Sequence, residues 1–181
     1  MNLKYKLTKE DFLFHQLYSA NHSKTIKRNA LNGQIALIVG FTSFTSVFYL
    51  IDEIFLVYFS AIFSVLIILM FPFFRKRALK RRLSEYVDEH YVERFGKEYN
   101  VQFNEDDFQI IDDTGEAKIK YSSLEKVIEL SSHYLLKSRS KGTLIIPKSA
   151  FENTDVIKAK LEALSEQLKI EYAKELNWKW K

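Results

Sequence analysis

Two uninterrupted apolar stretches decide the fold of this chain: LNGQIALIVGFTSFTSVFYLI (Leu31–Ile51) and IFLVYFSAIFSVLIILMFPFF (Ile54–Phe74). Neither contains a charged residue, and only Asp52 and Glu53 separate them. Each has 21 residues, which as an α-helix span about 30 Å, the thickness of a bilayer's hydrocarbon core. The alternative is a buried helix pair in a soluble protein, but such helices keep a polar face and these stretches have none. The pattern therefore predicts a transmembrane helical hairpin.

Basic residues lie at both outer ends of this hairpin. Lys24, Lys27 and Arg28 precede it, and a run of six cations follows it directly: Arg75, Lys76, Arg77, Lys80, Arg81 and Arg82. The connecting turn has two acids and no base. Because Lys and Arg in short loops stay on the cytoplasmic side, we expect a multi-pass protein of the cell membrane with both termini cytoplasmic.

The rest of the chain divides around the hairpin. Residues 1–30 read as a cytoplasmic strand, Asn2–Leu7, and a helix with Thr8 as N-cap and Asp11 in its first turn. They contain no short apolar run, so we expect no cleavable signal peptide. Residues 75–96 form a basic juxtamembrane helix that ends near Phe95, with Gly96 as C-cap. Residues 97–181 are long enough for one small cytoplasmic domain.

Apolar residues in this last segment change to a period of two. The pattern predicts six short antiparallel strands, the last three at Leu124–Leu130, His133–Ser138 and Gly142–Ile146. A helix follows from Asn153 or Thr154, with one apolar face formed by Ile157, Leu161, Leu164 and Leu168. The fold class is therefore α+β: a transmembrane hairpin (31–51 and 54–74) and a small β-barrel or curved sheet closed by a C-terminal helix. We expect Asn2–Leu7 to join this sheet, because a lone strand needs backbone partners.

Two short segments resemble the YcxB-like family of small bacterial membrane proteins. They are Tyr5-Lys6-Leu7-Thr8-Lys9-Glu10-Asp11-Phe12 and Leu144-Ile145-Ile146-Pro147-Lys148-Ser149-Ala150-Phe151, the latter similar to the family's closing IPK…F segment. Where the family often has Trp ahead of the fourth cytoplasmic strand, this chain has Tyr121. The resemblance implies a membrane hairpin and a cytoplasmic domain similar to pleckstrin-homology-like domains. It transfers no activity and no functional residue.

Charge and composition narrow the function classes. The formal net charge of +4 is smaller than the charge of residues 75–82 alone, so the remainder of the chain is slightly acidic. Nucleic-acid binding would need the basic charge spread over the folded domain, and we expect none. The basic run is either a simple topology anchor or a specific site for anionic lipid. Zero Cys excludes disulfides and thiolate chemistry.

Motifs for catalysis or metal binding are weak. Asp113-Thr114-Gly115 matches the aspartic-protease tripeptide, but its charged neighbours Asp112 and Glu116 favour a hairpin turn. Glu105-Asp106-Asp107 lacks the alternating ligands and the Gly of a calcium loop. We therefore predict a protein that is not an enzyme, with no catalytic residue, cofactor or metal.

Lys137, Arg139 and Lys141 alternate along an extended segment, which places all three cations on one side. They form either a lipid-phosphate site or a solvated edge that discourages strand aggregation. The leading hypothesis is a non-enzymatic, membrane-anchored module whose cytoplasmic domain binds a protein or peptide partner in regulation or assembly. The alternative is recognition of anionic lipid by the same domain and its basic residues.

Small residues predict how the two spans meet. Thr42 and Ser46 share one face of the first span, and Ser60 and Ser64 share one face of the second. In an antiparallel hairpin Ser46 lies level with Ser60, and Thr42 with Ser64, with Thr45 flanking this seam. The large side chains would then face lipid or another copy of the chain, which leaves a homo-oligomer open.

Overall fold

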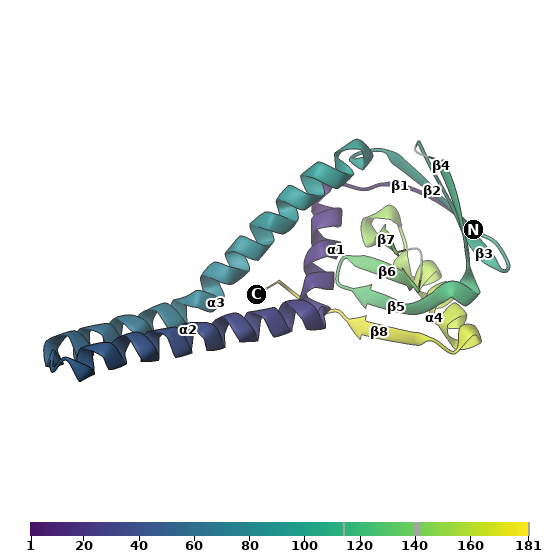
Figure 1. Ribbon diagram of the computed structural model, residues 1–181. Coiled ribbons are helices and arrows are strands. Elements are labelled where there is room, and N and C mark those ends of the chain that lie inside the picture. The colour runs from purple at the N-terminus through teal and green to yellow at the C-terminus, as the bar shows by residue number, and fades with distance from the viewer. Residues whose placement is uncertain (114, 140–141, 181) are drawn as a thin grey trace. The chain divides into compact units, whose positions relative to one another are not determined.

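The computed structural model of this protein describes residues 1–113, 115–139 and 142–180. The chain forms two compact units (Figure 1). We call residues 1–15 and 87–181 the β unit and residues 16–86 the helical unit. The fold is mixed α+β, with two long apolar helices and two four-stranded sheets.

The first sheet of the β unit has the order β1-β2-β3-β4 and is antiparallel throughout. Its strands are β1 (Asn2–Lys6), β2 (Glu98–Phe103), β3 (Asp107–Asp112) and β4 (Gly115–Lys120). The predicted joining of the N-terminal strand to this sheet is confirmed, because Leu3 pairs with Val101 and Tyr5 with Tyr99. All four of these side chains are buried, so the alternation of β1 fixes its register.

The second sheet has the order β7-β6-β5-β8. β5 (Leu124–Leu130) and β6 (His133–Ser138) have the predicted bounds, and β7 (Thr143–Pro147) differs by one residue at each end. β8 (Glu171–Glu175) was not predicted, and it pairs parallel to β5. The expectation of six antiparallel strands in this segment was therefore wrong by one strand. Among the described residues neither sheet closes into a barrel; the unit has two separate sheets instead.

Both sheets contribute to the core of the β unit, and the second sheet contains its most completely buried strand. Four consecutive residues of β6, His133–Leu136, are buried, which means that both faces of this strand are covered. The helix α4 (Thr154–Leu168) contributes the buried side chains Ile157, Leu161 and Leu164. Its predicted start is confirmed, since the Asn153 side chain accepts a hydrogen bond from the Asp155 N–H (2.8 Å). The Tyr5 hydroxyl donates to the Ile145 carbonyl (2.9 Å) and joins the two sheets.

Helix α1 (Lys9–His22) begins as predicted. The Thr8 N–H donates to the Asp11 carboxylate (2.7 Å), and the Asp11 N–H donates back to the Thr8 hydroxyl (3.3 Å). This reciprocal pair satisfies two of the N–H groups that a helix start leaves without partners.

The helical unit contains α2 (Lys24–Leu50) and most of α3 (Ile54–Tyr91). The second predicted span and the basic segment after it thus form one continuous helix. Asp52 adopts the left-handed conformation (φ 57°) in the turn between α2 and α3. Its N–H donates to the Tyr49 carbonyl and that of Glu53 to the Phe48 carbonyl. These two bonds make a Schellman motif, which ends α2 within two residues and lets α3 start at once.

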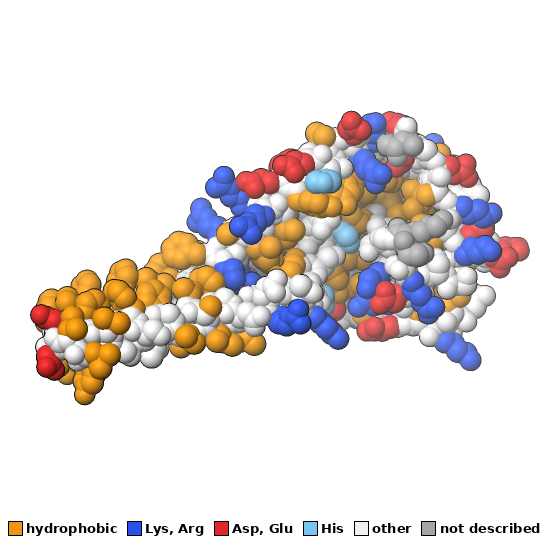
Figure 2. Space-filling model, viewed as in Figure 1, with side chains coloured by type: hydrophobic (Ala, Val, Ile, Leu, Met, Phe, Trp, Pro, Cys, Tyr) orange, Lys and Arg blue, Asp and Glu red, His pale blue; other side chains and the backbone are white. Residues whose placement is uncertain are grey.

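The two long helices are largely exposed. No residue of α2 is buried, and Figure 2 shows apolar side chains covering much of the hairpin surface. Both helices are long and apolar enough to cross a membrane.

Candidate functional site

The six cations of the basic run lie on successive turns of α3, so they point in different directions. Arg75 and Arg82 line a groove of about 550 Å³ between α2 and α3. Arg81 instead forms an ion pair with Glu85 one turn later (2.9 Å). Lys76, Arg77 and Lys80 are exposed and do not line this groove. The six cations therefore fall into two groups: two arginines line the groove, and the other four lie outside it.

Two of the three alternating cations of the β unit, Lys137 and Arg139, lie in the described part of the chain. Lys137 forms an ion pair with Glu125 of the neighbouring strand β5 (2.9 Å), which also holds the pKa of Glu125 below its usual value. The Arg139 N–H donates to the Ser123 carbonyl, and its side chain is exposed. Lys141 lies outside the described residues. One of the two described cations is thus already neutralised by a carboxylate.

The small residues of the hairpin are arranged differently from the prediction. Ser60 and Ser64 are buried, and the Ser60 hydroxyl donates to the hydroxyl of Thr45 on α2 (3.1 Å). Ser46, the predicted partner of Ser60, is exposed and donates to the Thr42 carbonyl of its own helix (2.9 Å). Thr42 is also exposed. The seam therefore uses the predicted face of α3 and, on α2, a face one residue further round the helix.

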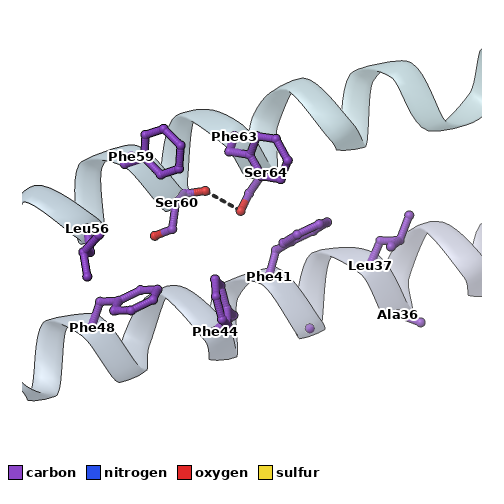
Figure 3. A pocket seen from close by; sticks show the side chains of 11 residues that line it. Ala36, Leu37, Phe41, Phe44, Phe48, Leu56, Phe59, Ser60, Phe63 and Ser64 are labelled. Carbon is purple, nitrogen blue, oxygen red and sulfur yellow. Dashed lines mark hydrogen bonds between the residues drawn. The ribbon is translucent and has the colours of Figure 1, made fainter.

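A second groove, of about 650 Å³, runs along this seam (Figure 3). Aromatic rings from both helices line it: Phe41, Phe44 and Phe48 of α2, and Phe59 and Phe63 of α3. On the α3 side the Ser64 hydroxyl donates a hydrogen bond to the Ser60 carbonyl. Apart from Ser60 and Ser64 its lining is apolar, which suits hydrocarbon.

A polar cluster that the sequence did not predict joins α1 to β6. His133 is buried, and its Nε2 lies 2.7 Å from Asp11 Oδ1, while its Nδ1 lies 2.8 Å from the Ser132 hydroxyl. The ring of Phe14 stacks on the His133 ring (4.7 Å), and Trp178 meets Phe14 edge-on (5.2 Å). The order Ser–His–carboxylate also occurs in hydrolases, but here it connects helix α1 to the start of strand β6. We interpret it as a clamp that holds α1 in the β unit.

Two titratable side chains of this region, Asp11 and His15, have shifted pKa values. Burial acts to raise the pKa of Asp11, but the hydrogen bonds from His133 and Thr8 outweigh it and hold the pKa below its usual value. His15, one turn further along α1, has its pKa lowered to about 4 by burial and by the nearby charge of His133. His15 is therefore neutral at physiological pH.

A second unpredicted cluster surrounds Glu129 on β5. Its carboxylate accepts hydrogen bonds from Lys148 (2.9 Å) and from the Tyr172 hydroxyl on β8 (3.1 Å). Burial acts to raise the pKa of Glu129, but these hydrogen bonds hold it below its usual value. The Lys148 ammonium also lies over the Tyr134 ring (4.8 Å), and burial raises the pKa of Tyr134 to about 12. Lys148 is the lysine of the IPK segment, so this segment has a structural role: it delivers a cation to a buried carboxylate.

Acidic residues of the two weak motifs have polar partners in the structure. Asp113 of the Asp-Thr-Gly tripeptide forms an ion pair with Lys97 (3.8 Å), and Thr114 lies outside the described residues. In the acidic turn, Asp107 accepts from the Asn104 amide (2.8 Å) and pairs with Lys118 (3.1 Å). No group of three or more metal-ligating side chains is found in the described part of the chain.

These features define an α+β protein with two long apolar helices and a two-sheet β unit. Residues 103–161 match the family model described as YcxB-like protein, which confirms the resemblance over this segment of the chain. The segment includes His133, Glu129 and Lys148, but neither the helical unit nor β8. No curated protein and no solved structure matches the chain.

Proposed function

We propose that this protein is a non-enzymatic module of the cell membrane, anchored by α2 and α3, whose β unit binds a protein or peptide partner in the cytoplasm. The anchor is supported by the exposure of the long helices, since a soluble protein rarely leaves so large an apolar surface uncovered. The orientation, with both termini cytoplasmic, is supported by the cations at the outer ends of the hairpin and the acids in its turn.

A pleckstrin-homology-like architecture of the β unit is part of this proposal. The sheet β1–β4, the strands β5–β7 and the following helix α4 supply the seven strands and one helix expected of such a fold. β8 is an addition at the edge of the second sheet. Folds of this kind host many functions, so the binding role must be argued from a surface of this chain.

The surface that carries the proposal is the outer edge of β4. Among the described strands β4 pairs with β3 alone, and its residues 115–118 are all exposed. An exposed strand edge presents N–H and C=O groups that an extended peptide can pair with, which is the common mode of β-augmentation.

The register shows which groups face outward. The Tyr121 N–H donates to the Asp106 carbonyl, which places these two residues opposite each other in a hydrogen-bonded pair. Hydrogen-bonded and non-bonded pairs alternate along an antiparallel ladder. Lys118 lies opposite Gln109 in a non-bonded position, and so does Glu116 opposite Ile111. The N–H groups of Glu116 and Lys118 therefore point away from β3, toward the outer edge of β4.

A proline tests this edge directly. A photoreactive amino acid at position 116 of the full-length protein, in its native membrane, should crosslink a partner. Lys118→Pro should abolish the crosslink because it removes an outward N–H. Lys118→Gln should preserve it; both variants lose the ion pair with Asp107, so they differ in the backbone donor. Equal crosslinking in the two variants would show that the partner does not add a strand at β4.

A further inference from the structure

The groove between α2 and α3 brings positive charge and apolar surface together at one level of the helical unit. It is lined from α3 by Phe71, Phe74, Arg75, Ala78, Leu79 and Arg82, and from α2 by Ile26, Asn29 and Ala30. No acidic residue lines it. Among the described residues neither arginine forms an ion pair, in contrast to Arg81 beside them.

Helical geometry explains why two of the six cations reach this groove. Successive residues of a helix are rotated by about 100°, so residues seven apart differ by about 20° and share one face. Arg75 and Arg82 are seven apart, and they are also about 10 Å apart along the axis. Arg77 and Lys80 lie on the opposite side of the same helix, which makes them natural controls.

The position of the groove relative to the apolar span identifies its ligand. Phe71 and Phe74 belong to the end of the apolar stretch, and Arg75 is the first charge after it. In the proposed membrane orientation this is the boundary between acyl chains and headgroups on the cytoplasmic side. Guanidinium groups form charge-assisted, often bidentate hydrogen bonds with phosphate oxygens. A phospholipid satisfies both halves of the groove, because its acyl chain fits the aromatic end and its phosphate the arginine end.

We propose that this groove is a binding site for an anionic phospholipid, with the phosphate held between Arg75 and Arg82 and the Asn29 amide as a further donor on α2. The inference rests on the proposed insertion of α2 and α3 in the membrane. It differs from general attraction of the basic run to anionic lipid, because it assigns binding to one face of α3. Four of the six cations lie outside the groove and are predicted to contribute little to it.

Lipid adducts counted by native mass spectrometry test the assignment on the full-length protein in detergent. Wild-type protein should retain added phosphatidylglycerol in preference to phosphatidylcholine. The double variant Arg75→Gln/Arg82→Gln should lower the affinity for phosphatidylglycerol about tenfold or more, since each lost bond involves two charged groups. The control Arg77→Gln/Lys80→Gln removes the same charge from the other side and should change the affinity less than about threefold, as expected of solvent-exposed charges.

A second measurement distinguishes failure of the lipid site from failure of the proposed membrane anchor. Extraction of membranes at alkaline pH tests membrane insertion independently of lipid binding. The wild-type protein and both double variants should stay in the membrane pellet. Protein in the pellet with no preference for phosphatidylglycerol, or with equal loss in the two double variants, overturns the lipid site and leaves the anchor standing. Release of wild-type protein into the supernatant overturns the anchor and with it the site.

Discussion

The buried ion pair between Lys148 and Glu129 gives the sharpest test of what holds the β unit together. The Glu129 side chain is 5% exposed and that of Lys148 19%, so Lys148→Ala would leave a carboxylate with little access to water. Removing one partner of such a pair costs about 3–5 kcal/mol. Because Lys148 keeps some contact with solvent and Tyr172 still donates to Glu129, we expect the lower end, about 3 kcal/mol at neutral pH.

Lys137 provides the matched control. It pairs with Glu125 at the same distance, 2.9 Å, but both side chains are 45% exposed. Because water solvates both charges well when the ion pair is lost, Lys137→Ala should lower the free energy of unfolding by less than about 1 kcal/mol. The two carboxylates, Glu129 and Glu125, lie on the same strand β5, so the comparison tests the effect of burial.

The loss of stability in Lys148→Ala should depend on pH, because the interaction with Glu129 is electrostatic. The folded-state pKa of Glu129 lies below its unfolded value, so the pair contributes above the unfolded pKa and loses its contribution as the pH falls through the folded pKa. In Lys148→Ala the deficit should be full at pH 7 and shrink toward about pH 4, where a protonated Glu129 no longer needs a cation.

Urea unfolding of full-length protein in detergent measures these quantities. The two tryptophans of the chain, Trp178 and Trp180, both belong to the β unit, so their fluorescence reports on that unit. At a slope of about 2 kcal/mol per M urea, Lys148→Ala should lower the midpoint by about 1.5 M. Equal losses for Lys148→Ala and Lys137→Ala, or a Lys148→Ala deficit that does not change with pH, would refute the argument from burial.

Two further predictions concern α1 and the hairpin. Since the folded-state pKa of His15 is about 4, below the value of the unfolded chain, stability should fall as the pH drops from about 6.5 toward 4. His15→Leu should flatten this part of the urea-midpoint profile, and an unchanged slope would assign the loss to other groups. In the hairpin, a cysteine pair at 45/60 should crosslink readily, because the native hydroxyls are 3.1 Å apart. A pair at 46/60 should crosslink more slowly, and the reverse order would restore the face predicted from the sequence.

Local patterns made most of the elements predictable. The two long apolar helices, the N-cap Thr8, the start of α4 near Asn153, and strands β5 and β6 all depend on residues a few positions apart, so local patterns indicate them. The pairing of β1 could also be inferred, because an amphipathic strand without a neighbour would leave its backbone groups unsatisfied. β8 escaped prediction because Glu171–Glu175 is five residues long, contains Ala, Lys and Glu, which favour helices, and pairs parallel with a distant strand.

The clusters could be predicted only in part. Asp11 was expected as a helix-start residue, but its contact with His133 joins positions 122 residues apart and leaves no local signal. In the hairpin, residue numbers fix the depth at which two side chains meet but not the rotation of each helix. A rotation of one residue, about 100°, replaces Ser46 by Thr45 at the seam.

The pairing of β1 with β2 has a consequence for how the protein is made. Lys6 pairs with Glu98, so β1 is synthesised well before its partner strand, which follows 92 positions later with the whole hairpin between them. If α2 and α3 insert as proposed, the sheet completes only when both ends of the hairpin emerge on the same side of the bilayer. If only one of the two helices crossed the bilayer, β1 and β2 would lie on opposite sides of the membrane, and the edge of β2 would remain uncovered. Under the proposed topology, completion of the sheet would thus depend on correct insertion of both helices, and a misinserted copy would expose the unpaired edge of β2.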